Sequence, residues 1–391
     1  MFKSPTDYNN VLRLIFHLDL DYFYAQCEEV RNPELRNHPL VVCVYSGRNT
    51  DSGVVSTSNY KARRFGVKSG MPIKIAKSKL ANEDAKFLPV EMSYYSHLST
   101  LAMESVRKIA DTYEYVGIDE RYADFTRHSG ADFSRARKIA DFIKSEIKVS
   151  TNLTCSIGAG PNKLVAKIAS NFQKPDSITI INPQEVKEFI TRCDIEDIPG
   201  IGPKNRIKLE SLGIESVSHL SKFDLFQLKE LFGYKIATYL QNAARGIDDA
   251  PIRPHVGKQI GRLVTLKNDV NNIENIFPIL NSLSSLVYDT LIKRQLSFRT
   301  IIVRLVLHDL RQVTCSRNLK LSSTSLEELQ NIARSLFLEA IHIHSLSFLN
   351  VTRIGITLSD LSTYIGQNKI LQYFVEESRN GNQESNCNNK L

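Results

Sequence analysis

Three acidic residues at the ends of predicted strands are the first candidates for chemistry in this chain. Asp19 follows the apolar stretch 12–18, which predicts a short strand. Asp119 and Glu120 lie 100 residues later, within residues 113–125, where two predicted strands meet at an acidic turn. A lone carboxylate at a strand end is commonly a solvated surface group. Here hydrophobic residues flank both ends and would form the floor of a shared site.

Such carboxylates suit magnesium, which takes hard oxygen ligands from one or two side chains together with substrate phosphates. Two such ions about 4 Å apart stabilise both the attacking and the leaving oxygen of an in-line phosphoryl displacement. The three acids therefore predict phosphoryl-transfer chemistry. Asp21 has two interpretations: it points with Asp19, or it caps the helix predicted for YFYAQCEEV. Asp124 is expected to be structural or exposed.

The elements around these acids mix strands and helices without strict alternation, which predicts an α+β fold. Further strands are expected at residues 39–45, 54–57 and 153–160, and helices at the basic stretch 59–70 and after Pro161-Asn162. The second half of the chain has a different pattern. Residues 181–245 are predicted to be helical, and residues 246–256, with two prolines and a glycine, read as a linker. A β-α-β-β-α-β pattern follows, and the Asn-rich residues 378–391 are expected to be disordered.

Composition sets the class of protein. The 391 residues allow two to four domains, and the net charge of +8 favours a polyanionic partner. The six scattered cysteines contain no C-x-x-C pair and indicate reduced thiols in a cytosol-like compartment. No apolar run approaches the roughly 18 residues of a membrane span. We therefore expect a soluble, cytoplasmic protein that does not bind membranes.

Two basic regions favour contacts with nucleic-acid backbones. The segment DIPGIGPKNRIKLESLGI resembles a helix-hairpin-helix, in which Gly200 and Gly202 shape a phosphate-binding turn. Lys204, Arg206 and Lys208 just after it add charge. A tight structural turn is the alternative. Residues 251–360 hold 13 basic and eight acidic side chains, a net charge of +5. More than half of the excess positive charge therefore belongs to this part of the chain.

Three segments together resemble the successive motifs of Y-family DNA polymerases, and of the archaeal DinB (DNA polymerase IV) branch in particular. They are LDLDYFYAQCEEV, SGVVSTSNYKARRFGVKSGMP and CSIGAGPNKLVAKIASNFQKP, and the resemblance runs from about residue 12 to residue 374. It implies a right-hand polymerase with a ferredoxin-like palm, small fingers, a helical thumb and a βαββαβ little finger. The implied boundaries are palm 1–23 and 90–180, fingers 24–89, thumb 181–245, linker 246–256, little finger 257–362 and a clamp-binding tail 363–391.

The resemblance also assigns roles at the site. It implies that Asp19, Asp119 and Glu120, with the backbone carbonyl of Leu20, hold two Mg²⁺ ions, for which Mn²⁺ can substitute. The triphosphate of a deoxynucleotide would meet a set of basic and hydroxyl groups, namely Thr57, Tyr60, Arg63 and Lys174. Arg64 is assigned instead to a solvated helix face.

Tyr24 matches the steric gate of the family, the aromatic ring that lies where a ribose 2′-hydroxyl would have to fit. Ordinary core packing beside Tyr22 and Phe23 is the alternative for this side chain.

The chain departs from the family pattern at the acidic turn, where Gly117 replaces the usual serine and Arg121 a small residue. We expect Gly117 to loosen the turn and Arg121 to pair with Glu120 or with a primer phosphate. Both departures put the rate and the metal affinity in question, while the ligands themselves are kept.

Two further contacts follow from the resemblance. Arg299, Arg304 and Arg317 are expected to line up along DNA phosphates on the little finger. Near the C-terminus, a motif with the spacing of sliding-clamp (PCNA-type) binding peptides is formed by Gln367, Ile370, Tyr373 and Phe374. A closing helix packed on the little finger is the alternative for that motif.

The sequence thus predicts a monomeric, low-fidelity DNA polymerase that bypasses damaged template bases on primer-template DNA and has no proofreading exonuclease. A catalytically weak, clamp-tethered DNA-binding scaffold is the first rival, which Gly117 and Arg121 alone support. A palm-type nucleotide cyclase is the second, and the basic C-terminal region counts against it. Primer extension with Mg²⁺ separates these functions.

Overall fold

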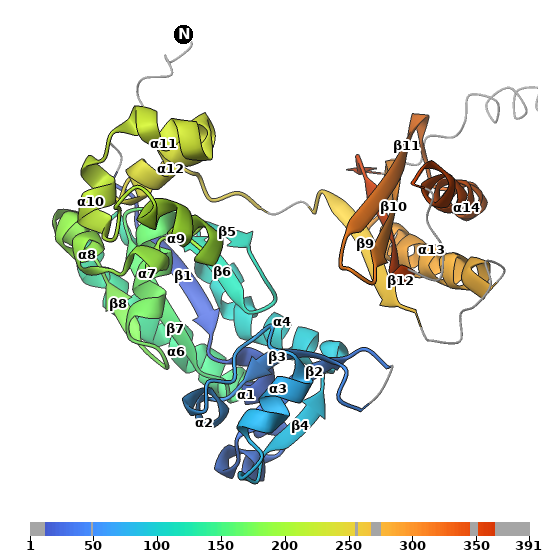
Figure 1. The fold of residues 1–391 in the computed structure, drawn as a ribbon. Helices are drawn as coiled ribbons and strands as arrows, with labels where there is room; N and C mark the ends of the chain where they lie inside the picture. The colour runs from blue at the N-terminus through green and yellow to red at the C-terminus, as the bar shows by residue number, and fades with distance from the viewer. Residues whose placement is uncertain (1–11, 48–49, 255–256, 267–274, 345–350, 364–391) are drawn as a thin grey trace, which may run out of the picture. The chain divides into compact units, whose positions relative to one another are not determined.

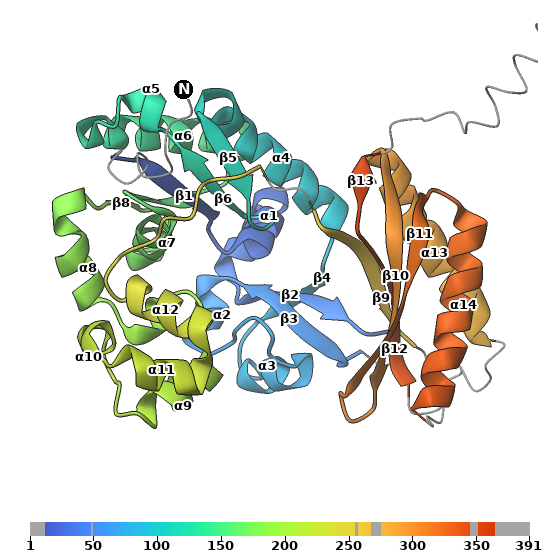
Figure 2. The ribbon, with the colours of Figure 1, turned by 90° about the horizontal axis from the view of Figure 1, so that it is seen from above.

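The computed structural model describes residues 12–47, 50–254, 257–266, 275–344 and 351–363. The chain forms two compact units, one of Met1–Tyr45 and Thr50–His255 and the other of Ser46–Asn49 and Val256–Leu391 (Figures 1 and 2). Strands and helices are mixed in both units, so the predicted α+β class is confirmed. Within the described ranges, no helix combines the length and the apolar character that a bilayer crossing requires.

A five-stranded sheet organises the first unit. Its central strand is β1 (Ile15–Leu20), which pairs antiparallel with β6 (Glu120–Asp124) and with β7 (Cys155–Gly160). The outer strands are β5 (Thr112–Tyr115) and β8 (Ile178–Ile180), which gives the order β5-β6-β1-β7-β8. The two strands expected around the acidic turn are therefore β5 and β6.

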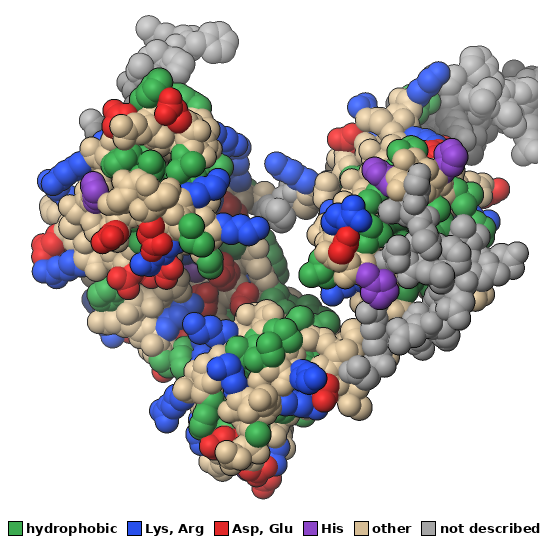
Figure 3. Space-filling model, viewed as in Figure 1, with side chains coloured by type: hydrophobic (Ala, Val, Ile, Leu, Met, Phe, Trp, Pro, Cys, Tyr) green, Lys and Arg blue, Asp and Glu red, His purple; other side chains and the backbone are tan. Residues whose placement is uncertain are grey.

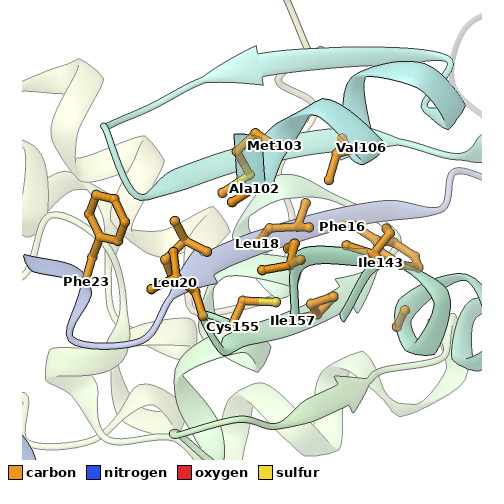
Figure 4. Packing of buried hydrophobic residues seen from close by; sticks show 14 of the residues in the cluster. Phe16, Leu18, Leu20, Phe23, Ala102, Met103, Val106, Ile143, Cys155 and Ile157 are labelled. Atoms are coloured by element: carbon orange, nitrogen blue, oxygen red, sulfur yellow. The ribbon is translucent and has the colours of Figure 1, made fainter. Parts of the chain in front are cut away.

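Both faces of β1 are covered, and along the strand the apolar Phe16, Leu18 and Leu20 alternate with Ile15, His17 and Asp19. Phe16, Leu18 and Leu20 pack against the long helices α4 (Met92–Ile109) and α6 (Ala136–Thr151), as Figure 4 shows for the core around Met103. On the other face, α7 (Lys163–Phe172) contacts β1 and β7. Burying one such apolar side chain contributes about 1.5–3 kcal/mol, so the strand is anchored from two sides.

A smaller three-stranded sheet follows β1 in sequence. The helix α1 (Phe23–Arg31) and the 3₁₀ turn η2 (Pro33–Asn37) lead into it, and its order is β3-β2-β4. The strands β2 (Leu40–Tyr45) and β3 (Gly53–Ser58) agree with the expected strands; β4 (Lys86–Pro89) was not expected. The expected basic helix is shorter than its sequence suggested: α2 is Tyr60–Arg64, and α3 (Ile73–Lys79) follows after a turn. These elements share a small core of their own.

The region that was expected to be helical consists of short helices around one core that includes residues of α7. A helix of this length is marginal in isolation, so its stability comes from packing. In chain order the elements are η4 (Pro183–Glu185), α8 (Val186–Arg192), η5 (Ile195–Asp197), α9 (Pro203–Glu210), α10 (Val217–Lys222), α11 (Leu225–Phe232) and α12 (Tyr234–Ala243). Between β6 and α6 lie two further short pieces, α5 (Thr126–Ser129) and η3 (Phe133–Arg135).

The second unit confirms the βαββαβ pattern. Its sheet has the order β11-β10-β12-β9, and a buried apolar core joins the sheet to two 18-residue helices. The elements are β9 (Gln259–Thr265), α13 (Ile276–Lys293), β10 (Leu296–Leu307), β11 (Gln312–Ser323), α14 (Leu326–Ile343) and β12 (Val351–Ser359), with the short β13 (Ser362–Thr363) paired to β10.

Candidate active site

The β-sheet register brings the three predicted acids together. Asp19 at the end of β1 lies directly opposite Glu120 at the start of β6. The backbone N–H of Leu20 donates to the carbonyl of Asp119 over 3.0 Å, which joins the acidic turn to the end of β1. The two parts of the site, 100 residues apart in the chain, are therefore neighbours because their strands are antiparallel partners.

Two of the three acids contact lysines. Lys174 Nζ lies 2.6 Å from Asp19 Oδ1, and Lys167 Nζ of α7 lies 2.8 Å from Glu120 Oε2. Three carboxylates thus face two ammonium groups, and one negative charge remains in excess. Figure 3 shows acidic side chains in a recessed part of the first unit, with lysine and arginine side chains on the surfaces around it.

The surroundings shift the pKa of each acid. Burial raises the pKa of Asp19 to about 6, against the opposing effect of Lys174. Burial also raises the pKa of Asp119, and the negative charge of Glu120 adds to the rise. Glu120 behaves differently, because His17 and Lys167 hold its pKa below its usual range. A negative charge is therefore unfavourable at two of the three acids unless a cation is near.

His17 also belongs to the site, although the sequence did not indicate it. It is fully buried on β1, its Nε2 lies 3.6 Å from Glu120 Oε2, and its Nδ1 lies 2.7 Å from the hydroxyl of Ser170. Burial lowers the pKa of His17 to about 4, so the ring is neutral at pH 7. Lys167, whose Nζ lies 2.8 Å from Glu120 Oε2, is therefore the stronger partner of Glu120.

The donor set fits a hard divalent cation, because it offers carboxylate oxygens that carry excess negative charge. Among the described residues, no three His, Cys, Asp or Glu side chains form a metal-binding group. Asp19 and Glu120 instead each face a lysine. A cation at these carboxylates would therefore compete with Lys174 and Lys167.

The turn that carries Asp119 is held by its neighbours. Ser99 of α4 donates its hydroxyl to the carbonyl of Ile118, and the backbone N–H groups of Val116 and Gly117 donate to the carbonyl of Glu120. One of these bonds comes from α4, and the other two close the turn on itself. These bonds hold the turn in place, and the expectation that Gly117 loosens it stays a prediction.

The expectation for Arg121 is wrong. Its side chain is only 1% exposed, so it does not reach outward towards a primer phosphate. Its Nη1 donates to the backbone carbonyls of Gly117 and Glu120, and the Glu120 carboxylate binds Lys167 instead. The register explains this direction, since Arg121 lies opposite Leu18, whose side chain packs in the core on the α4 and α6 side.

Asp21 does not cap α1, and its carboxylate lies on the same face of the sheet as Asp19, since it binds Ser156, which lies opposite Asp19. Residue Tyr22 precedes α1, with a positive φ of 34° and no capping side chain. The fully buried Asp21 carboxylate accepts hydrogen bonds from the hydroxyls of Thr154 (2.8 Å) and Ser156 (2.7 Å) and from the N–H of Asp176 (2.9 Å). It therefore ties the end of β1 to β7 and to the segment that follows Lys174.

Asp124, expected to be structural or exposed, is structural: its Oδ1 accepts the N–H of Thr126 over 2.8 Å.

The residues assigned to the triphosphate lie on β3, α2 and the segment after α7. Asn59 caps α2 by accepting the N–H of Ala62, which places Tyr60 at the first turn. The Arg63 guanidinium lies 4.9 Å from the centre of the Tyr60 ring, and its Nε donates to the carbonyl of Ser58. Thr57 precedes these residues on β3.

Tyr60 links this group to the acids. Its ring packs edge-on against Tyr22 at 5.2 Å. Burial raises the pKa of its phenol, and the charges of Asp21 and Asp19 contribute to the rise. Lys174, by contrast, is bound to Asp19, so a nucleotide would have to draw it from that carboxylate.

The Tyr24 side chain packs against the core. Its ring stacks on Tyr95 with centroids 4.7 Å apart and an interplanar angle of 16°. The side chain is half-buried, and besides burial the charge of Asp119 raises its pKa. The packing alternative and the steric gate are thus compatible.

At the predicted hairpin, Gly200 has a positive φ of 95°, and Gly202 is the residue before α9, which starts at Pro203. Lys204 lies exposed in the first turn of this helix. Arg206, expected to add charge there, is instead paired with Glu196 at 3.3 Å and with Glu210 at 2.8 Å.

On the second unit, the expected row of arginines is wrong for one member. Arg304 is exposed and lies opposite Thr314, whereas Arg317 lies opposite the buried Ile301. Arg317 therefore points to the helix-covered face, where it binds Glu339 and Ser335 of α14. Arg299 is exposed beside a bulge of β10. The motif of Gln367, Ile370, Tyr373 and Phe374 lies outside the described residues.

Sequence reasoning missed three residues of the site, His17, Lys167 and Ser99. Lys167 reaches Glu120 across 47 positions of the chain, and no local spacing indicates that pairing.

Comparisons with known proteins agree with this geometry. Residues 18–171 match the impB/mucB/samB family, residues 257–370 match its C-terminal domain, and residues 196–248 match the thumb domain of DNA polymerase-iota. A DNA polymerase IV of Nitrosopumilus maritimus is 42% identical over 93% of this chain and 99% of that protein. A DNA polymerase IV of Saccharolobus solfataricus is 42% identical over 68% of this chain and 75% of its own length.

Solved structures give the same result. A Y-family DNA polymerase chimera of Dbh and Dpo4 covers 89% of this chain and 98% of its own, with a TM-score of 0.81 and 34% identity. An insertion ternary complex of Dbh DNA polymerase covers 88% and 98%, with a TM-score of 0.68 and 33% identity. With this fold, this arrangement of acids and these relatives, the chain belongs to the impB/mucB/samB family, the Y-family of translesion DNA polymerases, and to its archaeal DNA polymerase IV branch.

Proposed function

We propose that this protein extends the 3′-hydroxyl of a DNA primer with deoxynucleotides, at low fidelity and across damaged template bases. The convergence of Asp19, Asp119 and Glu120 at one end of the palm sheet is the observation that carries the proposal. The ternary complexes solved for Dbh DNA polymerase support primer-template DNA and a nucleotide as the substrates. The separate cores of the first unit are consistent with the palm, fingers and thumb predicted from the sequence.

The three carboxylates and the carbonyl of Leu20 would hold two Mg²⁺ ions. Bound there, the ions would activate the primer hydroxyl and neutralise charge on the triphosphate. The chain's own cations complete the site: Arg63 offers a planar fork for phosphate oxygens, and Tyr60 beside it offers a hydroxyl. Lys174 is positioned to exchange the Asp19 carboxylate for a phosphate oxygen once the acid has another cation.

Two binding partners complete the proposal. Lys204 at the hairpin turn and exposed arginines of the second unit, such as Arg304, would contact DNA phosphates without base preference. The motif from Gln367 to Phe374 would bind a sliding clamp of the PCNA type. A clamp pull-down with Tyr373→Ala plus Phe374→Ala tests this contact, because loss of the aromatic anchors should abolish capture. Unchanged capture would refute it.

Primer extension with Mg²⁺ tests the central proposal. The wild-type chain should extend a primer, and the double variant Asp119→Ala plus Glu120→Ala should lose extension while it still binds primer-template DNA. Glu104→Ala plus Asp141→Ala is the matched control, because it removes two acids that lie outside the acidic turn, the half-buried Glu104 of α4 and the exposed Asp141 of α6. Wild-type protein that binds DNA but does not extend would favour the scaffold instead.

A further inference from the structure

Arg121 is the largest side chain that the structure buries completely. It stands next to Glu120 on β6, and its guanidinium carbon lies 3.1 Å from the centre of the Tyr115 ring on the neighbouring strand β5. Burying a guanidinium is strongly unfavourable unless its charge is compensated by hydrogen bonds or an aromatic face. An arginine at this position therefore needs a structural reason.

The hydrogen bonds of Arg121 indicate that reason. Its Nη1 donates both to the carbonyl of Gly117 and, over 2.7 Å, to the carbonyl of Glu120. One nitrogen thus bridges the two ends of the acidic turn. Hydrogen bonds from a charged donor are about twice as strong as neutral ones, so this bridge resists opening of the turn.

The other carbonyls of the turn accept from different elements. The carbonyl of Ile118 accepts from Ser99 of α4, and that of Asp119 from the N–H of Leu20. The carbonyl of Gly117 accepts from Arg121. The first corner of the turn therefore depends on the arginine, and the turn carries two of the three acids.

Gly117 contributes space to the same arrangement. A Cβ atom built at this residue would lie 3.2 Å from Asp119 Oδ1, closer than most such contacts. A side chain at residue 117 would therefore press on the Asp119 carboxylate. The glycine leaves that carboxylate free, and the arginine supplies the rigidity that a glycine removes.

We propose that Arg121 is a positioning residue for the polymerase reaction, which holds the Gly117–Glu120 turn and thereby aims the Asp119 and Glu120 carboxylates, with Gly117 as its partner. The inference rests on the proposed function, since it assigns a role at the same site. Arg121 does not touch substrate; it acts through the backbone of the turn.

The first test replaces Arg121 with methionine, which keeps the length but loses the donors, and with lysine, which keeps the charge and one donor. Loss of a residue that orients metal ligands typically weakens metal affinity about 10- to 100-fold. Arg121→Met should therefore weaken Mn²⁺ binding, measured by electron paramagnetic resonance without nucleotide, and should raise the Mg²⁺ requirement of extension at least about tenfold. Arg121→Lys should recover part of both losses, while primer-template affinity should stay unchanged.

Ile147→Ala is the control, because Ile147 is buried in the same palm core but on α6, away from the turn. It should lower the Tm while it leaves Mn²⁺ affinity at the wild-type value. If Arg121→Met binds Mn²⁺ with wild-type affinity, the positioning role is overturned. It is also overturned if Ile147→Ala, at the same loss of Tm as Arg121→Met, weakens Mn²⁺ binding by the same factor.

The second test concerns the pair. Gly117→Ala should itself weaken Mn²⁺ binding, and Gly117→Ala combined with Arg121→Met should lose less than the two separate losses predict, because both act on one turn. Additive losses would overturn the pairing. The polymerase activity and the role of Arg121 are tested by different outcomes. Wild-type protein that does not extend a primer refutes the polymerase, whereas a polymerase indifferent to Arg121 refutes only this inference.

Discussion

At the scale of single residues, the burial of Asp19 has a consequence for pH dependence. The pKa of this carboxyl is raised to about 6 by burial, and a proton and a metal cation compete for the same oxygens. Primer extension at limiting Mg²⁺ should therefore fall as the pH drops through about 6. The acidic limb should move to lower pH as Mg²⁺ is increased, which a pH series at several Mg²⁺ concentrations measures.

A variant at Lys174 tests the predicted pH dependence. Its positive charge opposes the rise in the pKa of Asp19, so Lys174→Ala should shift the acidic limb to higher pH. Replacing the exposed Lys148 of α6 should leave the limb in place. The folding stability responds to pH in the opposite direction to the activity. A carboxyl whose pKa is raised in the folded state contributes stability below its unfolded pKa, and this contribution is lost as the pH rises through about 6.

Tyr24 carries the second residue-scale prediction. Tyr24→Ala should admit ribonucleotides, with a loss of sugar discrimination of at least about tenfold, or 1.4 kcal/mol. The ring also stacks on Tyr95, so the variant should lose some thermal stability as well. Tyr24→Phe keeps the ring and should keep the discrimination. Equal use of ribonucleotides by wild type and Tyr24→Ala in primer extension would contradict the gate.

At the scale of elements, the junction of β1, β7 and the segment around Lys174 depends on Asp21. Three donors bind its buried carboxylate, and each buried donor left without its partner costs about 1–3 kcal/mol. Asp21→Ala should therefore lower the free energy of unfolding by several kcal/mol, measured in urea. Asp19→Asn should instead abolish primer extension. It should lose little stability, because it removes a buried charge. If Asp21→Ala were as stable as wild type, the junction would not depend on this carboxylate.

At the scale of the whole molecule, the positive charge predicts how DNA binding responds to salt. Each phosphate contact contributes about −0.9 to the slope of log K against log salt. Arg304→Ala removes an exposed cation and should reduce the slope by about that amount. Arg317→Ala is the contrast, since its cation is bound to Glu339 on the helix-covered face. It should lower stability and leave the slope unchanged, and an equal effect of both variants would contradict the assigned faces.

Much of the molecule followed from local patterns. The strand before Asp19, the two strands around the acidic turn and the βαββαβ order of the second unit were all predicted and confirmed. Such features depend on hydrophobic periodicity and turn residues, which act over a few neighbouring positions. The same applies to the order of motifs from which the family was recognised.

Only the tertiary structure decided the partners of the charged side chains. Arg317 binds α14, Arg121 bridges two carbonyls of the acidic turn, and Asp21 joins two strands. Lys167 reaches Glu120 across 47 positions. These contacts depend on strand register and on helix packing between distant segments. A shift of one residue in register turns a side chain to the opposite face of a sheet, and local sequence carries little information about that choice.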